Sequence, residues 1–262
     1  MPINNFIQMK YIISSLICLF IIACNGAKEK TTSDENILQP KENEWTEKQF
    51  PVLDSMRYNV GFLIMDGVYN TELTAPFDIF QHTIFRKNIK AMNVFTVADT
   101  DAAVLTFEGI RILPDYNYLT DNVPGIDILV VPSAAHHLDS DLENEAMLNF
   151  VRKAGNEAQF ITSHCDGAFV LAKAGLLENI VATTFPSDVD AMRSMFPSLD
   201  IRKDVLFVHD GKFITSAGGA KSFEAALYLC EFLYGKETAE SLAAGLVIDW
   251  KLSDVPHTII EN

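Results

Sequence analysis

The feature that most constrains the fold is a regular alternation of short apolar runs with segments of helical spacing, from residue 58 to about residue 250. Tyr58–Met65 and Ile126–Val131 are almost continuously apolar, as expected of strands buried on both faces. Thr71–Phe85 and Ser222–Tyr234 carry apolar residues at helical spacing. This order predicts an α/β domain, a three-layer sandwich in which a mostly parallel sheet has helices on both faces.

The N-terminus is typical of a bacterial lipoprotein. Tyr11–Ala23 is an apolar run of the length of a secretory signal, and it ends at Ala23-Cys24, a pattern that resembles a lipobox. We predict a signal peptide over residues 1–23, lipid on Cys24, a polar flexible tether over 24–55 and the α/β domain over 56–262. An uncleaved membrane anchor is the alternative. Both place the domain in the cell envelope, bound to a membrane and facing the periplasm or the exterior.

Net charge and cysteine content argue against a nucleic-acid partner and against a disulfide framework. The formal net charge of −15 repels phosphate backbones, so nucleic-acid binding is not expected. Of the four cysteines, only Cys165 and Cys230 fall in the α/β domain, which is too few for a disulfide framework. Cys230 lies in an apolar helical pattern and is predicted to be a core residue.

Cys165 is the candidate nucleophile, because it stands where a predicted strand turns directly into a helix. The small residues Ser163 and Gly167 flank it, as a nucleophile elbow requires. The dipole of the following helix is expected to lower the pKa of the thiol and to favour the thiolate. The alternative is a small core cysteine at a strand-to-helix junction.

Glu72 is the candidate acid, because it follows the first strand at the same edge of the sheet. Beside a thiolate its carboxyl would stay protonated, donate a hydrogen bond to the sulfur and later supply a proton. Charge complementarity at a helix N-terminus is the alternative role.

A third segment, VPSAAHHL, follows the central strand. Three backbone N–H groups are candidates for an oxyanion hole, those of Ser133, Ala134 and Asp166. His136 and His137 are weaker candidates for a base, and two surface histidines in a loop are an equal alternative.

These residues resemble a known family. From about Tyr58 to Tyr234 the chain is similar to the ThiJ/PfpI superfamily, which resembles class I glutamine amidotransferase domains, and within it to the isocyanide-hydratase-like branch. The resemblance rests on VGFLIMDGVYNTELTAPFDIF, DILVVPSA, ITSHCDGAFVLAKAGLLENIVATTFPSD and FITSAGGAKSFEAAL. It implies a flavodoxin-like sheet, Cys165 as nucleophile, Glu72 as its acidic partner, a homodimer, and no metal or cofactor.

The chain departs from the family pattern at three places. Ser133 and Ala134 stand where two glycines are usual, and Asp166 follows the nucleophile where Thr, Ala or His is common. The Asp166 charge would oppose thiolate formation or cap the helix. Phe185 follows ATT where hydratase-like members carry another aromatic residue or His, and it is expected to shape a pocket.

Three functions are compatible with this pattern. The first is a cysteine-dependent enzyme that hydrates or hydrolyses a small electrophile such as an isonitrile, a nitrile-like or reactive carbonyl compound, or an amide. The second is a ligand-binding or redox-sensing module that uses Cys165 without turnover. The third is a Cys-His amidase or peptidase with His136, His137 or a residue of a neighbouring subunit as base.

Overall fold

The computed structural model describes residues 48–261. The predicted signal peptide, Cys24 and most of the tether lie outside the described residues, so export and lipid attachment stay predictions. Within the described range, no helix is both long enough and apolar enough to cross a bilayer.

Strands and helices alternate along most of the described chain. In order they are β1 (Tyr58–Leu63), α1 (Asn70–Gln81), β2 (Met92–Ala98), β3 (Val104–Leu105), β4 (Arg111–Ile112), β5 (Tyr116–Asn117), β6 (Ile128–Val131), α2 (Glu145–Glu157), β7 (Phe160–His164), α3 (Gly167–Lys173), β8 (Val181–Ala182), α4 (Val189–Met195), β9 (Asp200–Ile201), β10 (Phe207–Asp210), β11 (Phe213–Ser216), α5 (Ser222–Tyr234), α6 (Lys236–Gly245) and β12 (His257–Ile260).

Eight of these strands form one sheet in the order β12-β10-β11-β7-β6-β1-β2-β5. All neighbouring pairs are parallel except β10 and β11, which form an antiparallel hairpin. The predicted α/β class is therefore confirmed. The parallel neighbours β11, β7, β6 and β1 present their carboxyl ends at one edge, where functional sites of such sheets gather.

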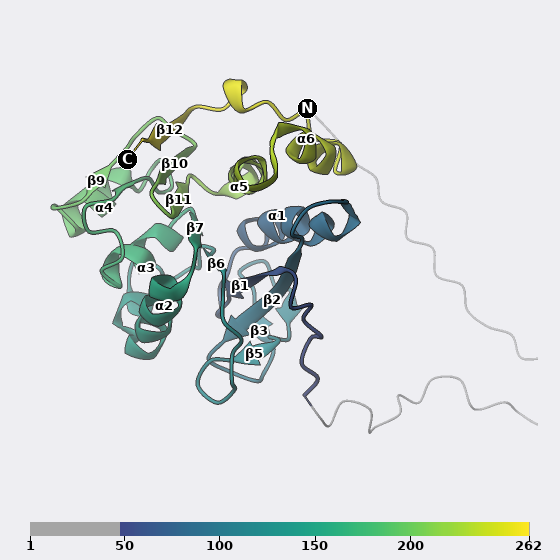
Figure 1. The fold of residues 1–262 in the computed structure, drawn as a ribbon. Coiled ribbons are helices and arrows are strands. Elements are labelled where there is room, and N and C mark those ends of the chain that lie inside the picture. Colours follow the sequence, from purple (N-terminus) through teal and green to yellow (C-terminus); the bar gives the residue numbers. More distant parts are fainter. Residues whose placement is uncertain (1–47, 262) are drawn as a thin grey trace, which may run out of the picture. The chain divides into compact units, whose positions relative to one another are not determined.

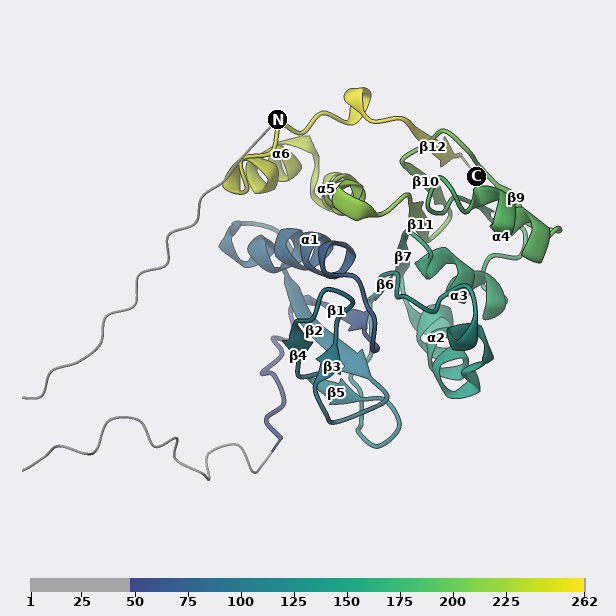
Figure 2. The same cartoon turned by 180° about the vertical axis from the view of Figure 1, so that it is seen from behind.

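Helices cover both faces of the sheet, because successive strand residues point to opposite sides. Val60, Phe62 and Ile128 are fully buried in the cluster that contains residues of α1, α5 and α6. Leu63 and Leu129 are equally buried in a second cluster, with residues of α2 and α3. Figure 1 and the reverse view in Figure 2 show these two groups of helices on opposite sides of the strands.

Three further details complete the fold. Gly155 lies inside α2, where an added Cβ would come within 2.7 Å of Cδ1 of Leu176, so a larger residue would displace that side chain. The last α-helix, α6, ends at Gly245. Strand β12 was not predicted, because its sequence HTII is short and its place depends on pairing with β10.

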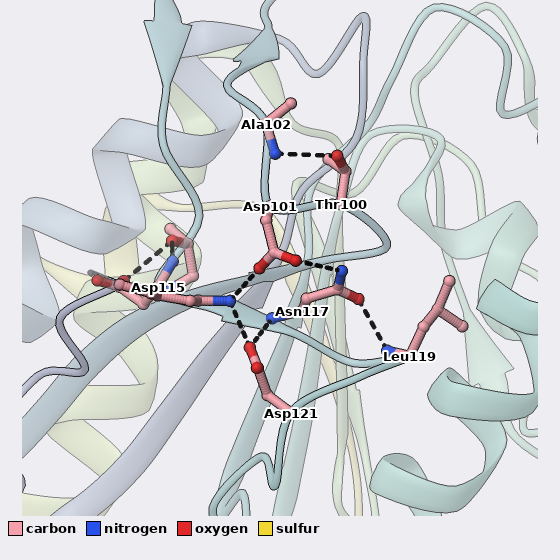
Figure 3. Close-up of polar contacts among 9 residues, drawn as sticks. Thr100, Asp101, Ala102, Asp115, Asn117, Leu119 and Asp121 are labelled. Atoms are coloured by element: carbon pink, nitrogen blue, oxygen red, sulfur yellow. Dashed lines mark hydrogen bonds and ion pairs between the residues drawn. The ribbon is translucent and has the colours of Figure 1, made fainter. Parts of the chain in front are cut away.

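A polar network fixes the edge of the sheet at β5. Asn117 donates its side-chain amide to Asp101 at 3.2 Å and its backbone N–H to Asp121 at 2.6 Å, and its amide oxygen accepts the N–H of Leu119 (Figure 3). Lys48 forms ion pairs with both aspartates. These contacts tie the first described residue to the short edge strand.

Candidate functional site

The turn at Cys165 is as tight as the sequence predicts. Strand β7 ends at His164, helix α3 begins at Gly167, and Cys165 has a φ of +54°. A non-glycine residue in this left-handed region carries strain of about 1–3 kcal/mol and persists where its surroundings hold it. The N–H of Cys165 donates to the Ser216 carbonyl at 2.9 Å, so the neighbouring strand β11 anchors the turn.

Two glycines make room for the turn. A Cβ on Gly167 would lie 2.0 Å from the Val131 carbonyl oxygen, so only glycine lets α3 begin this close to β6. A Cβ on Gly218 would lie 2.3 Å from the Cys165 Cβ and 2.6 Å from its nitrogen. The loop after β11 therefore closes directly over the nucleophile candidate, and this contact was not predicted.

Glu72 lies beside the turn, in the first turn of α1, and only 6% of the residue is exposed. Its Oε1 accepts the N–H of Gly219 at 3.0 Å. Burial raises the pKa of the carboxyl to about 6, while the N–H of Gly219 and the Cys165 thiol act in the opposite direction. Both protonation states of Glu72 are therefore available near neutral pH.

The Cys165 thiol is influenced by two carboxyl groups. Its Sγ donates to Oδ2 of Asp166 at 3.6 Å, and the charge of the Glu72 carboxyl also acts on the thiol. Burial raises the pKa of the thiol well above its usual range, and the charges of Glu72 and Asp166 raise it further. The expected lowering of the thiol pKa by the helix dipole is thus wrong, because desolvation and two nearby carboxylates outweigh it. The resting form is the neutral thiol.

The Asp166 side chain does not cap helix α3. Its Oδ1 accepts the hydroxyl of Thr184 at 3.0 Å, and its Oδ2 faces the sulfur. Burial, followed by the charge of Asp188, raises the pKa of the Asp166 carboxyl to about 6. Of the two roles weighed for this residue, the structure supports opposition to thiolate formation.

The three backbone N–H groups predicted for an oxyanion hole have different surroundings. The N–H of Asp166 lowers the pKa of the Cys165 thiol, and that of Ser133 lowers the pKa of the Glu72 carboxyl, each against the larger effect of burial. The N–H of Ala134 donates to Nδ1 of His137 at 3.2 Å. The Asp166 group is therefore the one of the three backbone N–H groups that acts on the pKa of the nucleophile.

The remaining predicted residues lie apart from the sulfur. His136 is exposed and pairs with Asp139 at 3.2 Å. His137 is fully buried, and burial lowers its pKa to about 3. Across residues 48–261, no hydrogen bond joins an imidazole to Cys165. Phe185 is 40% exposed and directly follows Thr184.

Sequence reasoning missed Thr184, Gly218 and Gly219 as site residues. Two adjacent glycines after a strand are a readable signal for backbone that approaches another group closely. The role of Thr184 has no such signal, since Thr184 lies in the loop that follows β8, a strand that pairs with β9 outside the main sheet. In the described part of the chain, no group of three or more His, Cys, Asp or Glu side chains is placed to hold a metal ion.

Comparison with known proteins agrees with this architecture. The chain is 28% identical to an isonitrile hydratase of Pseudomonas putida over 185 residues, which is 71% of this chain and 76% of that protein. It is also 28% identical to protein dj-1beta of Drosophila melanogaster, over 71% of this chain and 95% of that protein. A ThiJ/PfpI family protein from Pseudomonas syringae has the same fold, with a TM-score of 0.65, 21% identity and coverage of 83% of this chain and 84% of that one. The model of the DJ-1/PfpI family matches residues 58–231. The chain therefore belongs to the DJ-1/PfpI family.

Proposed function

We propose that this protein is an enzyme that adds water to a small electrophilic carbon compound through a covalent bond to Cys165. The observation that carries the proposal is a strained cysteine whose sulfur donates to the buried Asp166 carboxyl and is influenced by the buried Glu72 carboxyl. Two carboxyls with a pKa of about 6 can exchange protons near neutral pH. The similarity to an isonitrile hydratase makes an isonitrile the first substrate to test.

The chemistry of an isonitrile fits these groups. The thiol gives up its proton as the sulfur forms a bond to the terminal carbon, and that carbon takes a proton from Glu72 to give a thioimidate. Water then attacks the same carbon and returns a proton to Glu72. The proton that left the thiol reaches the nitrogen. The carbon–sulfur bond then breaks as the hydroxyl proton of the intermediate passes to the sulfur, which releases an N-substituted formamide and restores the thiol. The sum is one isonitrile and one water for one formamide.

The two other functions considered are less consistent with this geometry. Oxidation of a sensor cysteine follows its thiolate character, and the raised pKa of Cys165 works against it. An amidase needs an imidazole next to the sulfur, whereas His136 pairs with Asp139 and His137 with Ala134. Attachment to a membrane through Cys24, as the sequence predicts, would place the reaction in the cell envelope, but the chemistry does not depend on it.

The test uses purified protein and a small alkyl isonitrile, with formamide measured by NMR. We expect turnover by the wild type and a loss of more than about a thousandfold in Cys165→Ser, because an alcohol is a much poorer nucleophile here. Cys230→Ala is the matched control and should keep turnover, since Cys230 lies in helix α5 within the apolar core. Formamide production by Cys165→Ser at the wild-type rate would exclude the proposal.

A further inference from the structure

The two carboxyls beside Cys165 have unequal surroundings. Among the described residues Oε2 of Glu72 is buried without a hydrogen-bond partner, so an ionised oxygen there would lack compensation. Both oxygens of Asp166 are engaged, Oδ1 by the Thr184 hydroxyl at 3.0 Å and Oδ2 by the Cys165 sulfur at 3.6 Å. Since two like charges around one sulfur disfavour each other, Glu72 is the better candidate for the protonated group and Asp166 for the ionised one.

Thr184 holds the Asp166 carboxyl in this position. Its Oγ1 lies 3.0 Å from Oδ1 of Asp166 and 3.1 Å from the Cys165 carbonyl oxygen, and only 1% of the residue is exposed. The hydroxyl therefore bridges the side chain of one residue and the backbone of the one before it. This bridge fixes the rotation of the carboxyl and leaves Oδ2 directed at the sulfur.

We propose that the Asp166 carboxylate is the base that accepts the Cys165 proton as the sulfur attacks, a role that rests on the cysteine chemistry of the proposed function. The neutral thiol is a poor nucleophile, so its proton must leave during the attack. Oδ2 of Asp166 is the acceptor to which the sulfur donates. Glu72 then gives its proton to the substrate carbon, and Asp166 takes the proton of the sulfur.

The protons balance in this scheme. As the sulfur–carbon bond forms, the thiol proton moves to Oδ2 of Asp166 and the proton of Glu72 moves to the substrate carbon. Glu72 recovers its proton from the attacking water, and Asp166 protonates the nitrogen. In the last step the carbon–sulfur bond breaks while the hydroxyl proton of the intermediate passes to the sulfur through Asp166. Both carboxyls and the thiol return to their starting states.

The decisive variant is Asp166→Asn, which keeps the shape and removes the basic oxygen. If Asp166 only repels the thiolate, its replacement lowers the thiol pKa and speeds the reaction of Cys165 with any electrophile. If Asp166 is the base, the same replacement slows that reaction. We expect a loss of about a hundredfold in kcat/KM for the isonitrile and about tenfold slower alkylation of Cys165 by iodoacetamide at pH 7.

Alkylation needs no turnover, so it tests the base even if the protein hydrates no isonitrile. We expect the alkylation rate of the wild type to increase as the pH rises past about 6, the pKa of Asp166, because the carboxyl then ionises. This increase should be absent in Asp166→Asn. The groups that face this carboxyl and would shift the step are Cys165, Asp188, Glu72 and Tyr69. Alkylation of Asp166→Asn at the wild-type rate or faster would overturn the proposal.

Two further sets of variants keep the test independent of a folding defect. Asp190→Asn makes the same change on α4, where the side chain is 75% exposed, and should leave both rates unchanged. Thr184→Val removes the bridging hydroxyl and should slow alkylation by several-fold, whereas Thr184→Ser should restore it. Equal rates in Thr184→Val and the wild type would contradict the orientation that the proposal requires.

Discussion

Cys165 and Cys230 are the two free cysteines of the described chain, and both are buried, yet their surroundings differ in almost every other respect. Cys230 lies in the middle of helix α5, within the apolar cluster between the sheet and α1, α5 and α6. Cys165 stands outside regular structure, with a φ of +54°, at the carboxyl ends of parallel strands.

Burial alone does not distinguish the two thiols, because it raises the pKa of both above the usual range. The difference is that Cys165 also has charged and polar neighbours, the carboxyls of Glu72 and Asp166 and the N–H of Asp166. A buried thiol can react only where a neighbouring group accepts its proton, and Cys230 has no such group in the described structure. Reactivity thus depends on partners more than on exposure.

The largest expected effect comes from the glycine that encloses Cys165. Gly218 has a φ of +76° and a ψ of −157°, and an added Cβ would lie 2.3 Å from that of Cys165. We expect Gly218→Ala to lower the free energy of unfolding by about 3 kcal/mol or more, because the obstructing atoms include backbone that cannot rotate away. Denaturant unfolding measures this change.

Gly175 provides the control, because it has the same φ of +76° and nothing within 4 Å of an added Cβ. Gly175→Ala should therefore cost only about 1 kcal/mol, the price of a side chain in the left-handed region. Similar losses in the two variants would show that the Cys165 turn is not enclosed as tightly as the structure has it.

The second effect is on labelling of the native protein. We expect iodoacetamide to modify Cys165 at least about a hundredfold faster than Cys230, since Cys230 becomes accessible only when the surrounding core opens. Peptide mass analysis after a timed reaction at pH 7 gives the two rates. The same reaction in denaturant should label both cysteines equally, and equal labelling of the folded protein would remove the distinction between them.

Much of the difference between Cys165 and Cys230 could be predicted from the sequence. A cysteine between Ser163 and Gly167, after a strand and before a helix, indicates the turn from local residue types alone. The apolar pattern around Cys230 equally indicates a core helix position. Glu72 was found because the ends of parallel strands meet at one edge, so topology brings together residues that are far apart in sequence.

The electrostatics of the site could not be predicted in the same way. A helix N-terminus after Cys165 suggested a lowered thiol pKa, but the outcome depends on how much water the fold excludes and on the rotation of the Asp166 side chain. That rotation is set by Thr184, a residue that another loop supplies. Such balances arise only from packing in three dimensions, and they decide how readily each of the two buried carboxyls ionises.

The smallest expected effect concerns the stability that the folded protein loses because the Glu72 carboxyl is buried. Burial raises the pKa of Glu72 from 4.5 to about 6, so the folded state binds more protons than the unfolded state between these values. Stability is therefore highest below about pH 4.5 with respect to this group and falls as the pH rises through 6. Glu72→Gln should remove this loss and be more stable than the wild type by about 1–2 kcal/mol at pH 8.

Glu237 is the matched control, because it also lies in the first turn of a helix, α6, but is exposed. Glu237→Gln should lower stability slightly, by less than about 1 kcal/mol, through the lost interaction with the helix dipole. Denaturant unfolding at pH 8 measures the change in the free energy of unfolding for both variants. A gain for Glu72→Gln with a loss for Glu237→Gln would show that the carboxyl beside Cys165 destabilises the folded protein. If Glu72→Gln is less stable than the wild type, Glu72 has a structural role as the partner of Gly219. Asp166 would then be the one functional carboxyl that distinguishes the surroundings of Cys165 from those of Cys230.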